Sequence, residues 1–189
     1  MTIYIALLRG INVGGKNKIK MAELRQVLEE AGLIRVETYI QSGNVIFESE
    51  DGEDELKKKL EDQIRERFGF SVSVILRTSD QLGQLIRSCP YTEKEREAAK
   101  AQNSEGESFY VCLFHQAPLK EETKRLDPFV NEKDDYRMQG REIYLLLCHS
   151  IRNSKLSDKM SLLGGPVTVR NWKTMEKLHA MVTARISEE

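Results

Sequence analysis

The alternation of apolar and polar positions predicts a β-α-β-β-α-β order in the first part of the chain. Residues 2–8 are apolar on both alternating faces, which is typical of a strand buried on both sides in the middle of a sheet. Apolar residues then recur at helical spacing over residues 21–31 and 56–68, and a glycine follows each run. Further strands are expected at residues 34–40, 45–47 and 71–77, with a turn at Gln41-Ser42-Gly43-Asn44.

These patterns predict an α+β protein of the ferredoxin-like type. The first and third strands are apolar throughout, whereas the second and fourth alternate as edge strands do. A ferredoxin-like sandwich places strands one and three in the middle of its sheet. From Ser108 the order starts again, with strands expected at residues 109–114, 135–138, 143–148 and 167–169 and helices over 119–126 and 156–163.

We therefore expect two ferredoxin-like halves, each with an antiparallel sheet covered by helices. Residues 1–78 form the first half, and residues 108–189 form a second, shorter half that ends in an amphipathic C-terminal helix. Residues 79–107 form a linker of short helices, with capping boxes starting at Thr78 and Thr92 and a polar stretch at 100–107. The repeated element order suggests a duplication more strongly than the gapless alignment of segments 39–47 and 136–144 does.

Composition excludes several classes of protein. Lys and Arg (29) nearly balance Asp and Glu (30), so the chain lacks the charge excess of a histone-like nucleic-acid binder. No apolar run reaches the roughly 18–20 residues of a membrane span. The first ten residues lack the basic start of a secretion signal. We expect a cytoplasmic protein that does not interact with membranes.

The cysteines and histidines are few and scattered. Cys89, Cys112 and Cys148 are odd in number and lie in apolar surroundings, which predicts reduced thiols in the core. Cys148 and His149 would point to opposite faces of a strand and so could not form a catalytic dyad. The sequence has no CxxC motif, and its three histidines lie far apart, so we expect neither a metal site nor another cofactor.

A glycine-rich loop follows the first strand, in residues 9–17. Gly10 and Gly15-Lys16 satisfy the spacing GxxxxGK of a phosphate-binding loop, but Asn17 replaces the hydroxyl that would bind magnesium. The next helix begins near Met21, too late to point at a phosphate held by Lys16. Two readings remain: an ordinary turn before a helix, or a looser anion site with exposed backbone amides.

Two basic segments favour the anion site. Residues 1–20 hold four bases and no acid, and residues 152–178 hold six bases against two acids. In the second segment Asn171 is predicted to be the N-cap of the last helix, and Trp172 is expected to anchor that helix in the core. We predict ligand-binding roles for polar residues of three converging regions and of the turn at 154–155: Arg9, Asn12, Gly14, Gly15, Lys16, Lys20, Ser42, Asn44, Ser154, Lys155, Thr168, Arg170, Asn171 and Lys173.

Four motifs resemble an uncharacterised bacterial family, domain of unknown function 1697. They are RGINVGG at 9–15, YIQSGNVIF at 39–47, SKL at 154–156 and TVRNWKT at 168–174. The resemblance extends from about Ile3 to Leu178. It implies no activity, substrate or catalytic residue, because none is assigned to that family.

Three hypotheses for the function remain open. The first is a binding domain for a phosphate-bearing or other anionic ligand, such as nucleic acid; basic loops would bind it, because strands one and three offer only Tyr4 and Phe47 for base stacking. The second is an enzyme acting on a small anionic substrate between the halves, with Lys20 or Lys155 as the base. The third is a protein-interaction or dimerisation domain.

Overall fold

The chain contains two compact units, which are described one at a time. The structure is a computed structural model that describes residues 1–188. Unit 1 comprises residues 1–84 together with the chain from Glu176 on, and unit 2 comprises residues 85–175. The domain boundaries predicted from the sequence stay predictions. None of the helices within residues 1–188 is long and apolar enough to cross a membrane.

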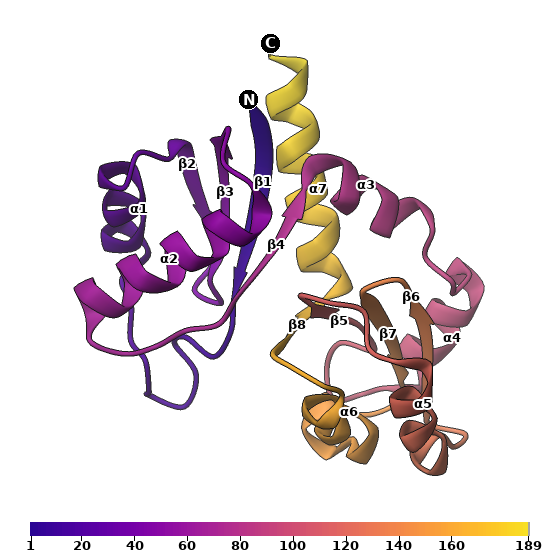
Figure 1. Ribbon diagram of the computed structural model, residues 1–189. Helices are drawn as coiled ribbons and strands as arrows, with labels where there is room; N and C mark the ends of the chain where they lie inside the picture. The colour runs from indigo at the N-terminus through magenta and orange to yellow at the C-terminus, as the bar shows by residue number, and fades with distance from the viewer. Residues whose placement is uncertain (189) are drawn as a thin grey trace. The chain divides into compact units, whose positions relative to one another are not determined.

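Unit 1 is a four-stranded antiparallel sheet with two helices on one face (Figure 1). The sheet order is β2-β3-β1-β4, so the fully apolar strands β1 and β3 lie in the middle, as their patterns predict. The elements run β1 (Thr2–Leu8), α1 (Met21–Glu30), β2 (Ile34–Tyr39), β3 (Asn44–Ser49), α2 (Glu53–Phe68) and β4 (Val74–Thr78). Helix α2 starts earlier than predicted because its first turn is acidic rather than apolar, which suits a helix N-terminus.

The core of unit 1 lies between this sheet and helices α1 and α2. Leu56, Leu60 and Ile64 of α2 are buried at i, i+4 spacing against the sheet. Tyr4 and Phe47 stack on each other inside this core, with ring centroids 5.8 Å apart. The aromatic side chains of strands β1 and β3 are therefore buried and do not form a base-stacking surface.

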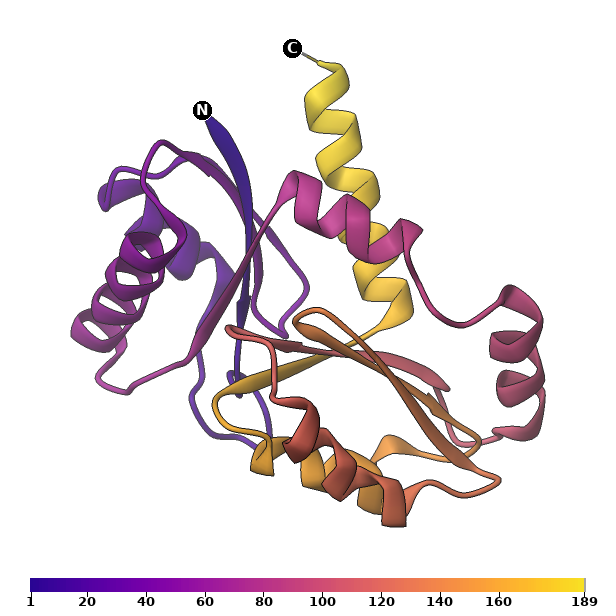
Figure 2. The ribbon, with the colours of Figure 1, turned by 45° about the vertical axis from the view of Figure 1, so that its right-hand side comes forward.

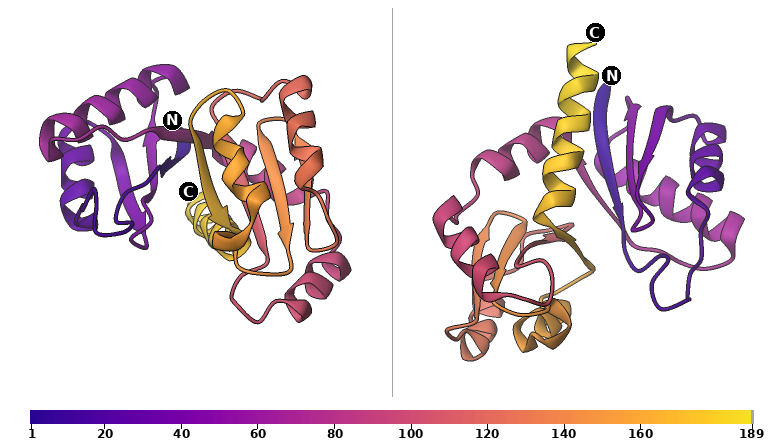
Figure 3. Two further views of the ribbon diagram at one scale, coloured as in Figure 1. Left: turned by 90° about the horizontal axis from the view of Figure 1, so that it is seen from below. Right: turned by 180° about the vertical axis from the view of Figure 1, so that it is seen from behind.

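The later part of helix α7 (Trp172–Ser187) packs beside the sheet of unit 1 (Figure 3). Buried Arg185 forms ion pairs with Glu37 of β2, at 3.1 Å, and with Glu48 of β3, at 3.6 Å. Glu48 faces away from Phe47 and hence away from α1 and α2. The ion pairs therefore attach α7 to the second face of the sheet.

Unit 2 repeats the strand order, with the antiparallel sheet β6-β7-β5-β8 covered on one face by short helical segments (Figure 2). Helix α3 (Ser79–Arg87) leads into this unit. The elements that follow are α4 (Glu93–Gln102), β5 (Phe109–Phe114), α5 (Lys120–Thr123), η1 (Lys124–Phe129), β6 (Asp134–Gln139), β7 (Glu142–Leu147), η2 (Ile151–Asn153), α6 (Lys155–Lys159), η3 (Met160–Leu162) and β8 (Val167–Asn171).

Both predicted capping boxes are confirmed, and several predicted boundaries need correction; among them, β4 begins at Val74 rather than at residue 71. Thr78 and Thr92 exchange hydrogen bonds with Gln81 and Glu95, respectively. Helix α4 continues to Gln102 into the stretch predicted as a linker, because its alanines and lysine favour helix. The last strand of unit 2 extends to Asn171, and β7 ends at Leu147, one residue before Cys148.

The gapless alignment of the two hairpins is wrong, because residues 40–43 separate the paired Tyr39 and Asn44, whereas residues 140–141 alone separate Gln139 and Glu142; between β3 and β7 the alignment is off by one residue. It matches Phe47 with Tyr144, yet Phe47 faces the helices of unit 1, whereas the helix-facing residues around Tyr144 are Ile143 and Leu145. A shift of one residue along a strand moves every side chain to the other face. Tyr144 instead packs with Phe109 and Trp172, which confirms that Trp172 anchors the last helix in a core.

A core position is confirmed for only one of the three thiols. Cys112 is fully buried, and burial raises its pKa. Cys89 and Cys148 are partly exposed, because neither lies within a strand or on the apolar face of a helix. All three are free cysteines.

Substitution of Gly43 tests the packing of the β2–β3 turn. A Cβ atom at Gly43 (φ +79°) would lie 2.7 Å from Ile11 and 2.8 Å from Leu8, so Gly43→Ala adds overpacking to backbone strain. We expect it to lower the free energy of unfolding by about 2–5 kcal/mol. Gly14→Ala is the matched control, because Gly14 has a similar φ of +59° and open space around it; about 1–2 kcal/mol is expected there. Urea unfolding that gave equal losses for both variants would contradict this packing.

Acid titration tests the ion pair between α4 and β6. Arg137 lies 2.6 Å from Glu95 and, with the capping bonds of Thr92, lowers the pKa of that carboxyl from its ordinary 4.5 to about 2. The stability that this carboxylate contributes is therefore present above pH 4.5 and lost between pH 4.5 and 2. In Arg137→Met the Glu95 pKa should rise toward 4.5, as measured by carboxyl ¹³C NMR, and it should stay low in Lys94→Met. A midpoint near 2 in Arg137→Met would refute the assignment.

Candidate functional site

The loop between β1 and α1 is a small hairpin. The amide of Lys16 donates to the carbonyl of Val13, and the amide of Asn12 donates to the carbonyl of Asn17, both at 3.1 Å. Gly14 and Gly15, with φ of +59° and +77°, occupy the two central positions of its turn, as a type I′ turn requires. This turn does not wrap a phosphate as a nucleotide-hydrolase loop does, and residues 17–20 separate it from α1. The geometry excludes a Walker site here.

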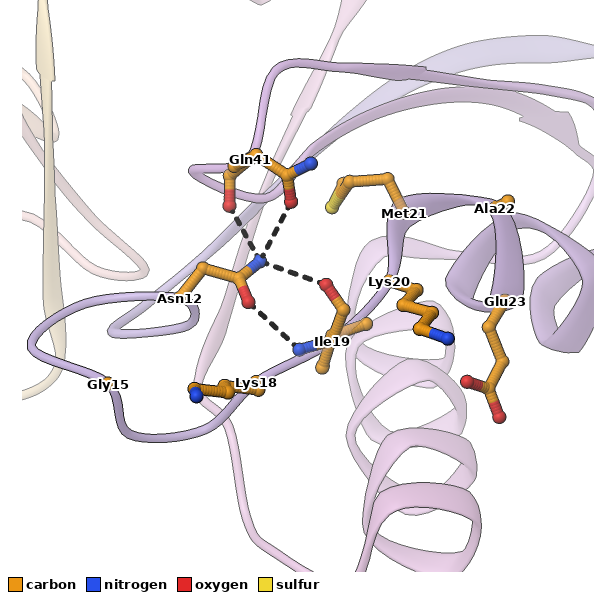
Figure 4. Close-up of a pocket in the computed structure, with 9 residues that line it drawn as sticks. All are labelled: Asn12, Gly15, Lys18, Ile19, Lys20, Met21, Ala22, Glu23 and Gln41. Atoms are coloured by element: carbon orange, nitrogen blue, oxygen red, sulfur yellow. Dashed lines mark hydrogen bonds between the residues drawn. The ribbon is translucent and has the colours of Figure 1, made fainter.

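The side chain of Asn12 holds this loop against the β2–β3 turn (Figure 4). Its Oδ1 accepts from the amide of Ile19 at 2.9 Å, and its Nδ2 donates to the carbonyl of Ile19 at 3.1 Å. The same Nδ2 donates to the carbonyl of Gln41 at 2.9 Å. One carboxamide therefore joins both ends of the loop to a turn 29 residues later in the chain.

A pocket of about 760 Å³ opens beside this clamp, and we call it the loop pocket (Figure 4). Its lining comes from the loop, the first turn of α1 and the β2–β3 turn: Asn12, Gly15, Lys18, Ile19, Lys20, Met21, Ala22, Glu23 and Gln41. Lys20 is the N-cap of α1 and provides no side-chain cap, so the first backbone amides of the helix lack that partner. These amides carry partial positive charge.

The basic side chains around the loop pocket are free. Arg9, Lys16, Lys18 and Lys20 are exposed, and within residues 1–188 their side chains form no ion pair or hydrogen bond. The one acidic residue of the lining, Glu23, is paired with Arg67 at 3.2 Å. The electrostatic balance of the loop pocket is therefore positive, although the whole chain is nearly neutral.

Of the predicted site residues of unit 1, Asn12, Gly15 and Lys20 line the loop pocket, and not all of the others face outward. Asn44 is fully buried and donates to the carbonyl of Tyr39 at 2.9 Å and to the hydroxyl of Ser42 at 3.0 Å. Gly43 is buried and accepts a hydrogen bond from the amide of Leu8. These residues shape the turn that carries Gln41, which lines the loop pocket.

Ser154 of unit 2 lies in a buried polar cluster rather than at a surface site. Its hydroxyl donates to Asp134 at 2.8 Å and caps α6 by accepting from Ser157. Nε2 of His149 lies 2.6 Å from the other carboxylate oxygen of Asp134. In a hydrolase triad the histidine bonds the serine and activates it. Here both the serine and the histidine contact the aspartate, and the hydroxyl of Ser154 donates to Asp134, so the arrangement differs from that of a hydrolase triad.

The remaining predicted residues of unit 2 also have structural partners, except for Lys155, which is exposed at the start of α6. Arg170 is buried and donates to the hydroxyl of Thr168 at 2.8 Å; burial lowers its pKa to about 10. Asn171 caps α7 by accepting from the amide of Thr174, as predicted. Lys173 pairs with Glu107 at 2.6 Å, which raises the pKa of Lys173. The predicted convergence of this segment with the loop of unit 1 stays a prediction.

The predicted site residues left out six residues that line the loop pocket: Lys18, Ile19, Met21, Ala22, Glu23 and Gln41. The sequence pattern placed Met21 only on the apolar face of a helix. Gln41 lay in the recognised turn QSGN, but its place depends on the long-range bond to Asn12. Among residues 1–188 no group of three or more histidine, cysteine or acidic side chains is placed to hold a metal ion.

Comparison with known proteins gives a family and a similar solved structure. It is similar to the solved structure of "conserved bacterial protein SP0830 from Streptococcus pneumoniae", with 28% identity, a TM-score of 0.71 and coverage of 96% of this chain and 98% of the other. No curated protein matches the sequence. The sequence pattern of a family described as "Protein of unknown function (DUF1697)" matches residues 1–144. The chain belongs to this family.

Proposed function

We propose that unit 1 binds a phosphate-bearing ligand at the loop pocket, as a free small molecule or as part of a nucleic acid. The observation that carries the proposal is the group of four exposed cations, Arg9, Lys16, Lys18 and Lys20, none of which has a partner among residues 1–188. Two of them, Lys18 and Lys20, line the loop pocket, and cations without counter-charges attract an anion. The uncapped first turn of α1 adds amide donors on the same side.

Binding accounts for the loop pocket better than catalysis does. A general base must reach the reacting proton and be free to accept it. The single carboxylate of the lining belongs to Glu23, which is held by Arg67. Lys20, the alternative base considered from sequence, is exposed to solvent, and within residues 1–188 its side chain has no hydrogen-bond partner that would orient it toward a reacting proton.

We further propose that both halves are ferredoxin-like and that the protein is cytoplasmic. Each sheet has its first and third strands in the middle, and helical segments cross over on one face. The three cysteines are free, in keeping with a reducing compartment.

Removal of two lysines tests the proposal. In Lys18→Ala/Lys20→Ala we expect the affinity for a fluorescein-labelled single-stranded oligonucleotide to fall roughly 10- to 100-fold, as measured by fluorescence anisotropy. The slope of log affinity against log salt should decrease by about 1.4, because about 0.7 counterions are released per phosphate contact. The affinity for inorganic phosphate, followed by ³¹P NMR, should fall as well.

Lys94→Ala/Lys100→Ala is the matched control, because it removes the same charge from exposed positions of α4. Its affinity should stay within about twofold of that of the unmodified protein. Equal losses in the two double variants would mean that only net charge matters. Absence of binding of both probes to the unmodified protein would end the proposal.

A further inference from the structure

We infer that the ligand of the loop pocket is a nucleotide, in which a planar nitrogen heterocycle accompanies the phosphate. This inference rests on the proposed phosphate site and adds the part of the ligand that the lysines do not bind. A phosphate ion alone would leave most of a pocket of about 760 Å³ empty, since pockets of roughly 300–1,000 Å³ hold ligands of drug size.

The side of the loop pocket away from Lys18 offers a neutral donor next to an apolar surface. The side chains of Gln41 and Met21 lie near each other there (Figure 4). Nδ2 of Asn12 lies 3.4 Å from Oε1 of Gln41, and this orients the carboxamide so that its Nε2 points away from Asn12. Within residues 1–188 this Nε2 has no acceptor, so it is available to a ligand.

A strained backbone conformation at the preceding residue holds Gln41 in place. Ile40, the preceding residue, has a φ of +49°, which is rare for a β-branched residue and costs on the order of 1–3 kcal/mol. The carbonyls on either side of it are both fixed by asparagine side chains: Asn44 donates to Tyr39, and Asn12 donates to Gln41, each at 2.9 Å. The donor at Gln41 is therefore preorganised, which lowers the entropic cost of binding.

This combination favours a heterocycle over other phosphate esters. The polarisable sulfur of Met21 and the aliphatic side chains of Ile19 and Ala22 suit an aromatic face. A ring nitrogen or carbonyl can accept from Nε2 of Gln41. An acyl chain has no acceptor for that donor, and a sugar would need more neutral polar partners than the lining provides.

A ligand series separates this inference from the proposed function. Isothermal titration calorimetry should show that at least one of the adenosine, guanosine, cytidine and uridine 5′-monophosphates binds the full chain 10-fold or more tightly than ribose 5-phosphate does. Gln41→Met keeps the length of the side chain and removes its donor. It should reduce that preference about 2- to 10-fold, the effect of one hydrogen bond, and change the affinity for ribose 5-phosphate less than twofold.

Two controls make each outcome decisive. Gln26→Met, an exposed position on α1 outside the lining, should leave both affinities unchanged, and Lys18→Ala/Lys20→Ala should lower both. If ribose 5-phosphate binds as tightly as every nucleotide, or if Gln41→Met keeps the full preference, the inference is overturned while the phosphate site stands. If neither ribose 5-phosphate nor any nucleotide binds, both the inference and the proposed phosphate site are contradicted.

Discussion

A single carboxamide, that of Asn12, controls the geometry of the candidate site. Asn12 itself has a φ of +55°, a conformation that asparagine tolerates better than most residues. Its side chain pairs with both backbone groups of Ile19 and with the carbonyl of Gln41, so it joins the start of the loop, the end of the loop and the β2–β3 turn. Without it, Lys18 and Lys20 near the end of the loop would lose their hydrogen-bonded connection to the turn that carries Gln41. Binding would then have to offset the entropy of ordering each of them.

The two units share a strand order but differ in the connection that follows their first strand. Both units use the same strand order, but residues 9–20 separate β1 from α1, whereas residues 115–119 alone separate β5 from α5. The additional length in unit 1 forms the glycine hairpin and the basic side of the loop pocket. A rigid sheet thus carries a long loop that is ordered by internal hydrogen bonds, a common way to position binding groups.

Local sequence patterns predicted most of the helices and strands, but they did not predict the long-range contacts that form the candidate site. The apolar run of β1, the capping boxes at Thr78 and Thr92 and the cap at Asn171 depend on neighbouring residues, and all are confirmed. The hairpin comparison failed because one residue of register, which local pattern does not fix, decides whether Tyr144 faces the helices. Likewise the motif residues Asn44 and Ser154 are polar but buried, and their partners are set by the fold. Gln41 was missed because its role depends on Asn12, far away in sequence.

The most direct test is a phosphate titration of ¹⁵N-labelled protein, followed by amide chemical shifts, in the unmodified chain and in Asn12→Gly. Glycine adopts the positive φ without strain and lacks the carboxamide, so a change in phosphate binding reports the loss of the side chain rather than backbone strain. The account predicts that amides of Gly15, Met21 and Ala22 shift on titration of the unmodified chain and fail to shift in Asn12→Gly, while the amide of Phe47 in the core is unchanged in both. Shifts located elsewhere, or equal shifts at the loop pocket in both proteins, would contradict it.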